Sequence, residues 1–215
     1  MSFVDYVLRN FDIIEFYFVQ HVEVVLLSVA IAAVIGVGLG VATERIGWLR
    51  RTLLAVTGTL LTIPSFALFG LLIPLFDLGL KPTVVALTLY AIFPILRNTV
   101  TGLETVDHAA VDAARGMGLA AGQRLRLVRL PLAWPVILNG IRVTTLISIS
   151  IAVVGAVVQG PGLGILLLNG ISRIGAANSF YQVLAGTLLC LVVAAVFEIF
   201  FAIVQRLTIP RGIRV

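Results

Sequence analysis

The sequence predicts an all-α polytopic membrane protein that forms a single transmembrane domain over residues 1–215. Hydrophobic residues make up 60% of the chain and charged residues only 12%, and the mean hydropathy is +1.14. A soluble domain is usually about 45–50% apolar and about 25% charged. The apolar residues also gather in runs of about twenty, which is the length a helix needs to cross the ~30 Å hydrocarbon core of a bilayer.

Five apolar runs are candidate membrane spans, and they cover residues 24–42, 53–76, 83–96, 133–158 and 183–204. Within hydrocarbon every backbone amide must be paired inside its own segment or in a closed barrel. The runs lack the two-residue alternation of barrel strands, so we expect five helices.

Individual runs carry further signals. In the first run, Gly36 and Gly40 lie four residues apart, which predicts close packing against another helix. The second run holds Pro64 and Pro74 but is expected to cross as one span, and the third continues past residue 96 as a helix that leaves the membrane. Cys190 in the fifth run is expected to act as a small buried hydrophobe.

Orientation follows from the basic residues of the connections, because Lys and Arg accumulate on the cytoplasmic side. One side holds only Arg9, Lys81 and Arg173, and the other holds eleven arginines: Arg45, Arg50, Arg51, Arg97, Arg115, Arg124, Arg126, Arg129, Arg206, Arg211 and Arg214. We therefore expect a multi-pass protein of the inner or plasma membrane, with its N-terminus outside and its C-terminus in the cytoplasm.

The connection at 106–131 interrupts the apolar runs with small and charged residues. It predicts two short helices, the first capped by Asp107 and ended by Gly116 and Gly118, the second ended by Pro131. One interpretation is an amphipathic loop lying on anionic lipid. The alternative is a docking surface for a cytosolic partner, because alanine and glycine let another surface approach the backbone closely.

A spaced pattern in this connection favours the partner. It reads Asp112-Ala113-Ala114, three residues, Gly118, nine residues, Val128, one residue and Leu130-Pro131. This resembles the cytoplasmic loop of binding-protein-dependent type I (MetI-like) ABC importer permeases, Glu-Ala-Ala-x3-Gly-x9-Ile-x-Leu-Pro, with Asp112 in place of Glu and Val128 in place of Ile. Residues 61–103 and 160–164 look similar to the glycine betaine/carnitine/choline (osmoprotectant) subfamily.

The resemblance implies five spans with a coupling helix between the third and fourth. It also implies cytosolic ABC ATPase subunits as partners, together with a second permease, identical or homologous, and an external substrate-binding protein. ATP and Mg would be used by the ATPase subunits, so no cofactor is expected on this chain.

Several residues inside the runs are candidates for the solute path or for hinges. Pro64 and Pro94 each remove a helical hydrogen bond, and Thr62 and Ser65 could satisfy freed carbonyls. Asn98 and Arg142 are further candidates. Arg142 and Glu198 lie at depths of about 10 and 12 Å in their spans, which predicts a buried ion pair, with a lining or snorkelling charge as the alternative.

The sequence shows no catalytic constellation and no nucleotide-binding G-x-x-x-x-G-K-[ST] motif, so an enzyme is not expected. His21 and His108 lack metal-ligand spacing and are expected at the surface. The charge distribution argues against nucleic acid as a partner.

Other hypotheses for the function are an importer for another small solute such as an amino acid, a secondary transporter driven by an ion gradient, and a membrane scaffold without transport.

Overall fold

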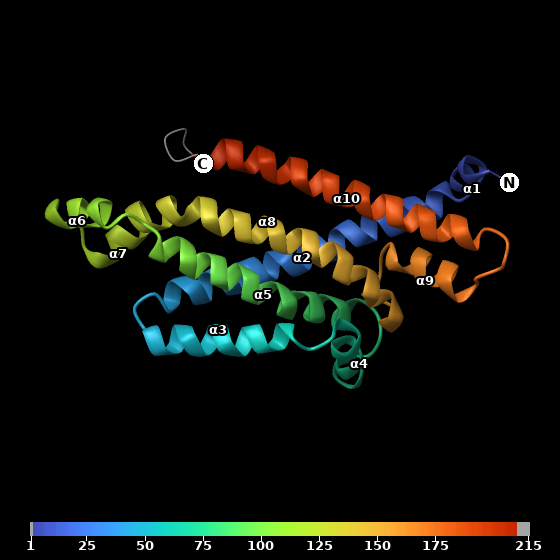
Figure 1. The fold of residues 1–215 in the computed structure, drawn as a ribbon, viewed down its shortest axis with the longest axis horizontal. Coiled ribbons are helices and arrows are strands. Elements are labelled where there is room, and N and C mark those ends of the chain that lie inside the picture. The colour runs from blue at the N-terminus through green and yellow to red at the C-terminus, as the bar shows by residue number, and fades with distance from the viewer. Residues whose placement is uncertain (1, 210–215) are drawn as a thin grey trace.

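A computed structural model of the chain describes residues 2–209, and over that range every regular element is a helix. The long helices run along one long axis, and α4 lies across it (Figure 1). In chain order they are α1 (Phe3–Arg9), α2 (Phe11–Ala42), α3 (Gly47–Leu61), α4 (Ser65–Phe76), α5 (Leu80–Glu104), α6 (His108–Gly116), α7 (Ala121–Arg124), the π-helical turn η1 (Leu125–Arg129), α8 (Leu130–Val154), the 3-10 turn η2 (Gly155–Val158), α9 (Gly164–Ser172) and α10 (Ser179–Thr208).

Four of the five predicted spans coincide with helices long and apolar enough to cross a bilayer. These helices cover Phe11–Ala42, Leu80–Glu104, Ala121–Val158 and Ser179–Thr208. The first begins thirteen residues before the predicted boundary at residue 24, because the helix continues through the charged stretch that contains Glu15 and Glu23.

The span expected at 53–76 is not one continuous helix. The chain breaks between α3 and α4, whose axes differ by 99°, and α4 turns across the end of α3 (Figure 1). Pro64 has φ −57° and ψ 134°, an extended conformation, and α4 starts at the next residue. A proline cannot donate the backbone hydrogen bond that would continue α3. The Ile63 carbonyl lies at the break and accepts a hydrogen bond from the Tyr90 hydroxyl of α5, at 2.8 Å.

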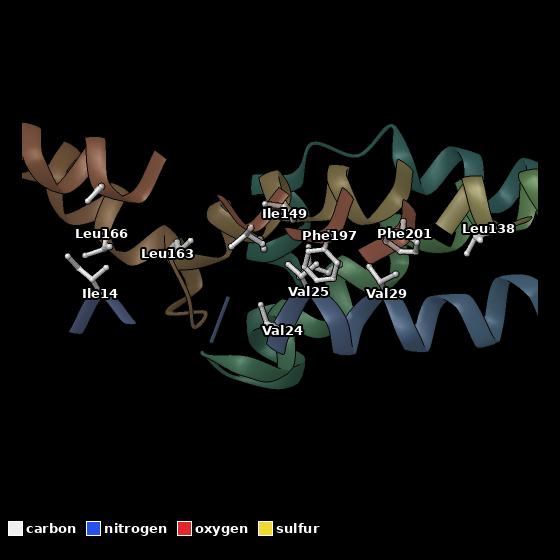
Figure 2. Close-up of a cluster of buried hydrophobic side chains, with 14 of the residues drawn as sticks. Ile14, Val24, Val25, Val29, Leu138, Ile149, Leu163, Leu166, Phe197 and Phe201 are labelled. Atoms are coloured by element: carbon white, nitrogen blue, oxygen red, sulfur yellow. The ribbon is translucent and has the colours of Figure 1, made fainter. Parts of the chain in front are cut away.

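The largest apolar core lies where α2, α8 and α10 meet. Val25 and Val29 of α2 face Phe197 and Phe201 of α10, and Val24 belongs to the same cluster (Figure 2). Ile149 and Leu138 of α8 extend the same cluster along the bundle, and Leu163 and Leu166 close it at the end near α9 (Figure 2).

Glycines set the distance between α2 and α5. A Cβ atom at Gly36 would lie 2.9 Å from Ile95 Cγ2, and one at Gly40 would lie 2.6 Å from Thr99 Cγ2. Gly38, between them, faces open space. The prediction that Gly36 and Gly40 form a close helix contact is therefore confirmed, and Gly38 takes no part in it.

His21 is fully buried, so the prediction that it lies at the surface is wrong. It packs against the 160–164 turn, where a Cβ atom at Gly162 would lie 2.8 Å from His21 Nδ1. The sequence expectation failed because α2 starts earlier than predicted and carries His21 inside the bundle. His108 is exposed as predicted, and Cys190 is half-buried.

Candidate functional site

The segment between α5 and α8 projects from one end of the bundle. α6 and α7 extend past the neighbouring helix ends, while α1 and α9 lie at the opposite end (Figure 1). The α2–α3 connection and the last turns of α10 point to the same end as α6 (Figure 1). Most of the arginines from the predicted basic side therefore gather there: Arg45, Arg50, Arg51, Arg115, Arg124, Arg126, Arg129 and Arg206. Arg211 and Arg214 lie outside the described residues.

α6 is a short helix with a defined start. Asp107 caps it as predicted, because its Oδ1 accepts a hydrogen bond from the Ala109 backbone N–H at 2.9 Å. Asp112 and Ala113 are exposed, whereas Ala114 is turned inward and is only 1% exposed. The two alanines of the pattern thus have different environments: Ala113 offers a small outer surface, and Ala114 seats the helix on the bundle.

Gly118 ends α6 in a C-capping arrangement that requires a left-handed residue. Its φ is +78°, its N–H donates to the Arg115 carbonyl at 3.0 Å, and the next N–H, from Leu119, donates to the Ala114 carbonyl at 3.2 Å. These are the two hydrogen bonds of a Schellman motif, in which glycine is the preferred residue. A Cβ at Gly118 would meet no atom within 4 Å, so the backbone is open to a partner from outside.

Pro131 does not end the second short helix, contrary to the sequence prediction. The helix passes from α7 through η1 into α8, and Pro131 occupies the first turn of α8. The Leu130 N–H reaches back five residues to the Leu125 carbonyl. A π-helical turn is wider than an α-helical one, and it accommodates the proline ring and its missing N–H without breaking the helix. Val128 and Leu130 are half-buried and Pro131 is exposed.

Arg129 ties this segment to two other helices. Its guanidinium forms an ion pair with Glu44, which follows α2, and donates from Nη2 to the Leu103 carbonyl of α5 at 2.8 Å. Next to it, Arg50 of α3 pairs with Glu104 at 2.8 Å. A pocket of about 310 Å³ opens beside the ion pair. From the sequence these arginines indicated only the orientation of the protein. Their contacts could not be predicted, because the partners are distant in sequence.

Arg142 and Glu198 come together in the structure, and the guanidinium of α8 donates to the carboxylate of α10. Their side chains are 32% and 35% exposed, so the pair lies at the edge of the α8–α10 contact rather than in its centre.

The other candidate path residues lie in two places. Thr62, Pro64 and Ser65 form the α3–α4 break, where the Thr62 hydroxyl bonds the Thr59 carbonyl at 2.7 Å. Pro94 and Asn98 lie one turn apart on α5, which runs unbroken through Pro94, and Asn98 Nδ2 donates to the Pro94 carbonyl at 2.8 Å. No hydrogen bond or ion pair among residues 2–209 joins Arg142 to either group.

Asn98 also lies at a close approach of α5 and α8. A Cβ atom at Gly140 of α8 would lie 2.4 Å from Asn98 Cβ. Within the described part of the chain, no group of three or more His, Cys, Asp or Glu side chains is placed to hold a metal ion.

Comparison with known proteins identifies relatives over nearly the whole chain. The chain is 41% identical to the osmoprotectant import permease protein OsmW of Salmonella typhimurium, with 100% of both chains covered. It is 32% identical to the choline transport system permease protein OpuBB of Bacillus subtilis, over 91% of this chain and 88% of that protein. It is 33% identical to the carnitine transport permease protein OpuCD of Listeria monocytogenes, over 96% of this chain and 92% of that protein.

Solved structures share the fold. The inward-facing MetNI methionine ABC transporter matches with a TM-score of 0.77 at 22% identity, over 89% of this chain and 94% of that chain. An amino acid ABC transporter crystallised with histidines matches with a TM-score of 0.79 at 15% identity, over 96% and 98%. The model of one family, described as binding-protein-dependent transport system inner membrane component, matches residues 32–210. The chain therefore belongs to this family of membrane-spanning transport permeases.

Proposed function

We propose that this permease imports a compatible solute such as glycine betaine, choline or carnitine. The support is the similarity over nearly the full length to permeases named for osmoprotectant, choline and carnitine transport. ATP and Mg would be bound by separate cytosolic ATPase subunits. A second permease, identical or homologous, and an external substrate-binding protein would complete the transporter.

The mechanism is inferred from α6, which is exposed and is capped at its start by Asp107 and at its end by the Gly118 motif. It presents Asp112, Ala113 and the open Gly118 backbone beyond the membrane-spanning helices, at the arginine-rich end. This end is cytoplasmic by the positive-inside rule. The proposal is that α6 docks on the ATPase subunit as a coupling helix. ATP-driven closure of the ATPase dimer then moves the segment 106–131 and changes which side of the membrane the solute cavity faces.

The α3–α4 break and the Pro94–Asn98 turn are the proposed path and hinge elements. The helix breaks at the first, whereas α5 continues through the second and loses only the N–H that Pro94 lacks. Exposed or half-buried polar side chains lie at both: Thr62, Ser65 and Asn98. Irregular backbone at membrane depth is tolerated where it lies within protein or lines a water-filled cavity. The Arg142–Glu198 pair is proposed as a structural link between α8 and α10.

Uptake by the complete transporter in proteoliposomes tests the solute. We expect ATP-dependent accumulation of labelled glycine betaine, choline or carnitine, and competition among these three but not by methionine or histidine. Accumulation of an amino acid and none of the quaternary amines would instead establish the amino-acid importer. Accumulation that needs an ion gradient and no ATP would refute an ATP-driven mechanism.

A further inference from the structure

The contacts of Arg129 join the segment that contains α6 to the rest of the bundle. Its Nη1 pairs with Glu44, two residues after α2 ends, and its Nη2 donates to the Leu103 carbonyl one residue before α5 ends. The Arg129 side chain is 24% exposed and that of Glu44 only 11%. A planar guanidinium can hold two acceptors in fixed directions at once, which an ammonium group cannot do with the same geometry.

The two helices that Arg129 reaches behave as one packed unit. Gly36 and Gly40 of α2 fit against Ile95 and Thr99 of α5 with no room for an added methyl group. The adjacent Arg50–Glu104 pair attaches α3 to the same end of α5. Close-packed interfaces do not deform continuously. When Arg129 is pushed, α2, α3 and α5 therefore either hold it in place or move together with it.

On the other side, Arg129 is the last residue of η1 and continues directly into α8. The wide turn of η1 is the least regular part of the continuous helix from α7 to α8. Motion of α6 and α7 can bend this turn, and the Arg129 contacts at its end add a direct link to α2 and α5 beside the packing of α8 on α5 at Gly140 and Asn98.

We propose that Arg129 is a positioning residue that transmits movement of the coupling segment to α2 and α5 through Glu44 and the Leu103 carbonyl. This inference rests on the proposed function of α6 as the ATPase dock. Without the Arg129 contacts, the ATPase subunit still docks and hydrolyses ATP, but the movement reaches the membrane helices incompletely.

The test uses the complete transporter with Arg129→Gln, Arg129→Lys and Glu44→Gln. Three quantities are measured: ATPase subunits co-purified per permease, ATP hydrolysed in the presence of the solute-loaded binding protein, and solute imported per ATP. We expect normal co-purification and a fall of about five-fold or more in solute imported per ATP for Arg129→Gln, in the range of typical coupling effects. Arg129→Lys should be intermediate, and Glu44→Gln should resemble it.

Arg51→Gln is the matched control. Arg51 lies at the same end of the bundle, but within residues 2–209 its side chain bonds only the Gly47 carbonyl of its own helix, through Nε at 3.3 Å. It should import as much solute per ATP as the unaltered protein.

Unchanged solute import per ATP in Arg129→Gln with ATPase bound would overturn the inference. If Arg129→Gln does not accumulate in the membrane, the milder Arg129→Lys and Glu44→Gln variants decide, and normal coupling in both would overturn it as well. Failure of the unaltered chain to bind ATPase subunits would instead refute the proposed function of α6.

Discussion

Arg142 on α8 and Glu198 on α10 form an ion pair across 56 residues of sequence. Both charges lie inside apolar spans, where an unpaired ion costs about 2.5–3.5 kcal/mol on insertion scales. Each residue therefore limits the cost of the other, and the pair joins α10 to α8 at a level where the surrounding contacts are apolar.

Neutralising one member of the pair should destabilise the protein more than neutralising both. Arg142→Met and Glu198→Leu each leave one charge without its partner and should lower the stability by about 2–3 kcal/mol. The double variant should be less destabilised than either single variant, which requires a coupling of at least about 2–3 kcal/mol relative to the sum of the single effects. Thermal unfolding of the detergent-purified protein measures this coupling. Strict additivity would show that the ion pair contributes nothing to stability.

Gly118→Arg should abolish ATPase association and uptake without preventing membrane insertion. The substitution adds bulk and charge at the open end of α6, and it also places an L-residue at φ +78°. Gly175→Arg is the matched control, because Gly175 has φ +90° and equally open surroundings at the other end of the bundle. The two variants share a backbone cost of about 1–2 kcal/mol for an L-residue in the left-handed region.

Co-purification of ATPase subunits with each glycine variant provides the measurement. We expect loss for Gly118→Arg and retention for Gly175→Arg. Equal loss in both would indicate backbone strain as the cause, and retention in both would favour a lipid-facing role for the segment.

Gly40→Ala and Gly38→Ala should differ strongly although the two positions are separated by one residue. A methyl group at Gly40 meets Thr99 Cγ2 at 2.6 Å, so α2 and α5 must separate, at a cost of about 1–3 kcal/mol. At Gly38 the methyl group meets nothing within 4 Å, and alanine should stabilise the helix by up to about 1 kcal/mol. Melting temperatures of the two variants should therefore move in opposite directions. Similar shifts would mean that α2 and α5 are not held at this distance.

Cysteine labelling tests the orientation of the bundle. In a Cys190→Ala background, Gly122→Cys lies at the arginine-rich end and Asp12→Cys at the start of α2; both positions are exposed. In intact cells a membrane-impermeant maleimide should label Asp12→Cys and not Gly122→Cys, and permeabilisation should make Gly122→Cys reactive. The opposite pattern would reverse the orientation and place α6 outside the cell.

The features that depend on a local pattern of residues could be predicted from the sequence. The apolar runs of α2, α5, α8 and α10 are continuous enough to be recognised from composition alone, and Asp107 before an alanine-rich turn indicated the start of α6. The family to which the chain belongs consists of binding-protein-dependent transport components of the inner membrane. This membership does not support the two alternatives, a transporter driven by an ion gradient and a scaffold without transport.

The features that could not be predicted from the sequence depend on contacts between residues that are distant along the chain. A proline at position 64 is compatible with a kinked span as well as with a break. The break is stabilised by Tyr90, whose hydroxyl donates a hydrogen bond to the carbonyl of Ile63, 27 residues away in sequence. The burial of His21 likewise depends on the 160–164 turn folding back over α2. At Pro131 the usual helix-breaking rule failed, because the preceding turn widens to a π-helix.

Tyr90 and Leu103 lie on the same helix, α5, and each contacts a different part of the protein. Tyr90 holds the α3–α4 break, and the Leu103 carbonyl is held by Arg129. The thirteen intervening steps span about 20 Å at 1.5 Å per residue, so a tilt of ~10° about the midpoint displaces each end by about 2 Å in opposite directions. A displacement of the Leu103 end of α5 toward one side would therefore move the Tyr90 end, and with it the α3–α4 break, toward the opposite side.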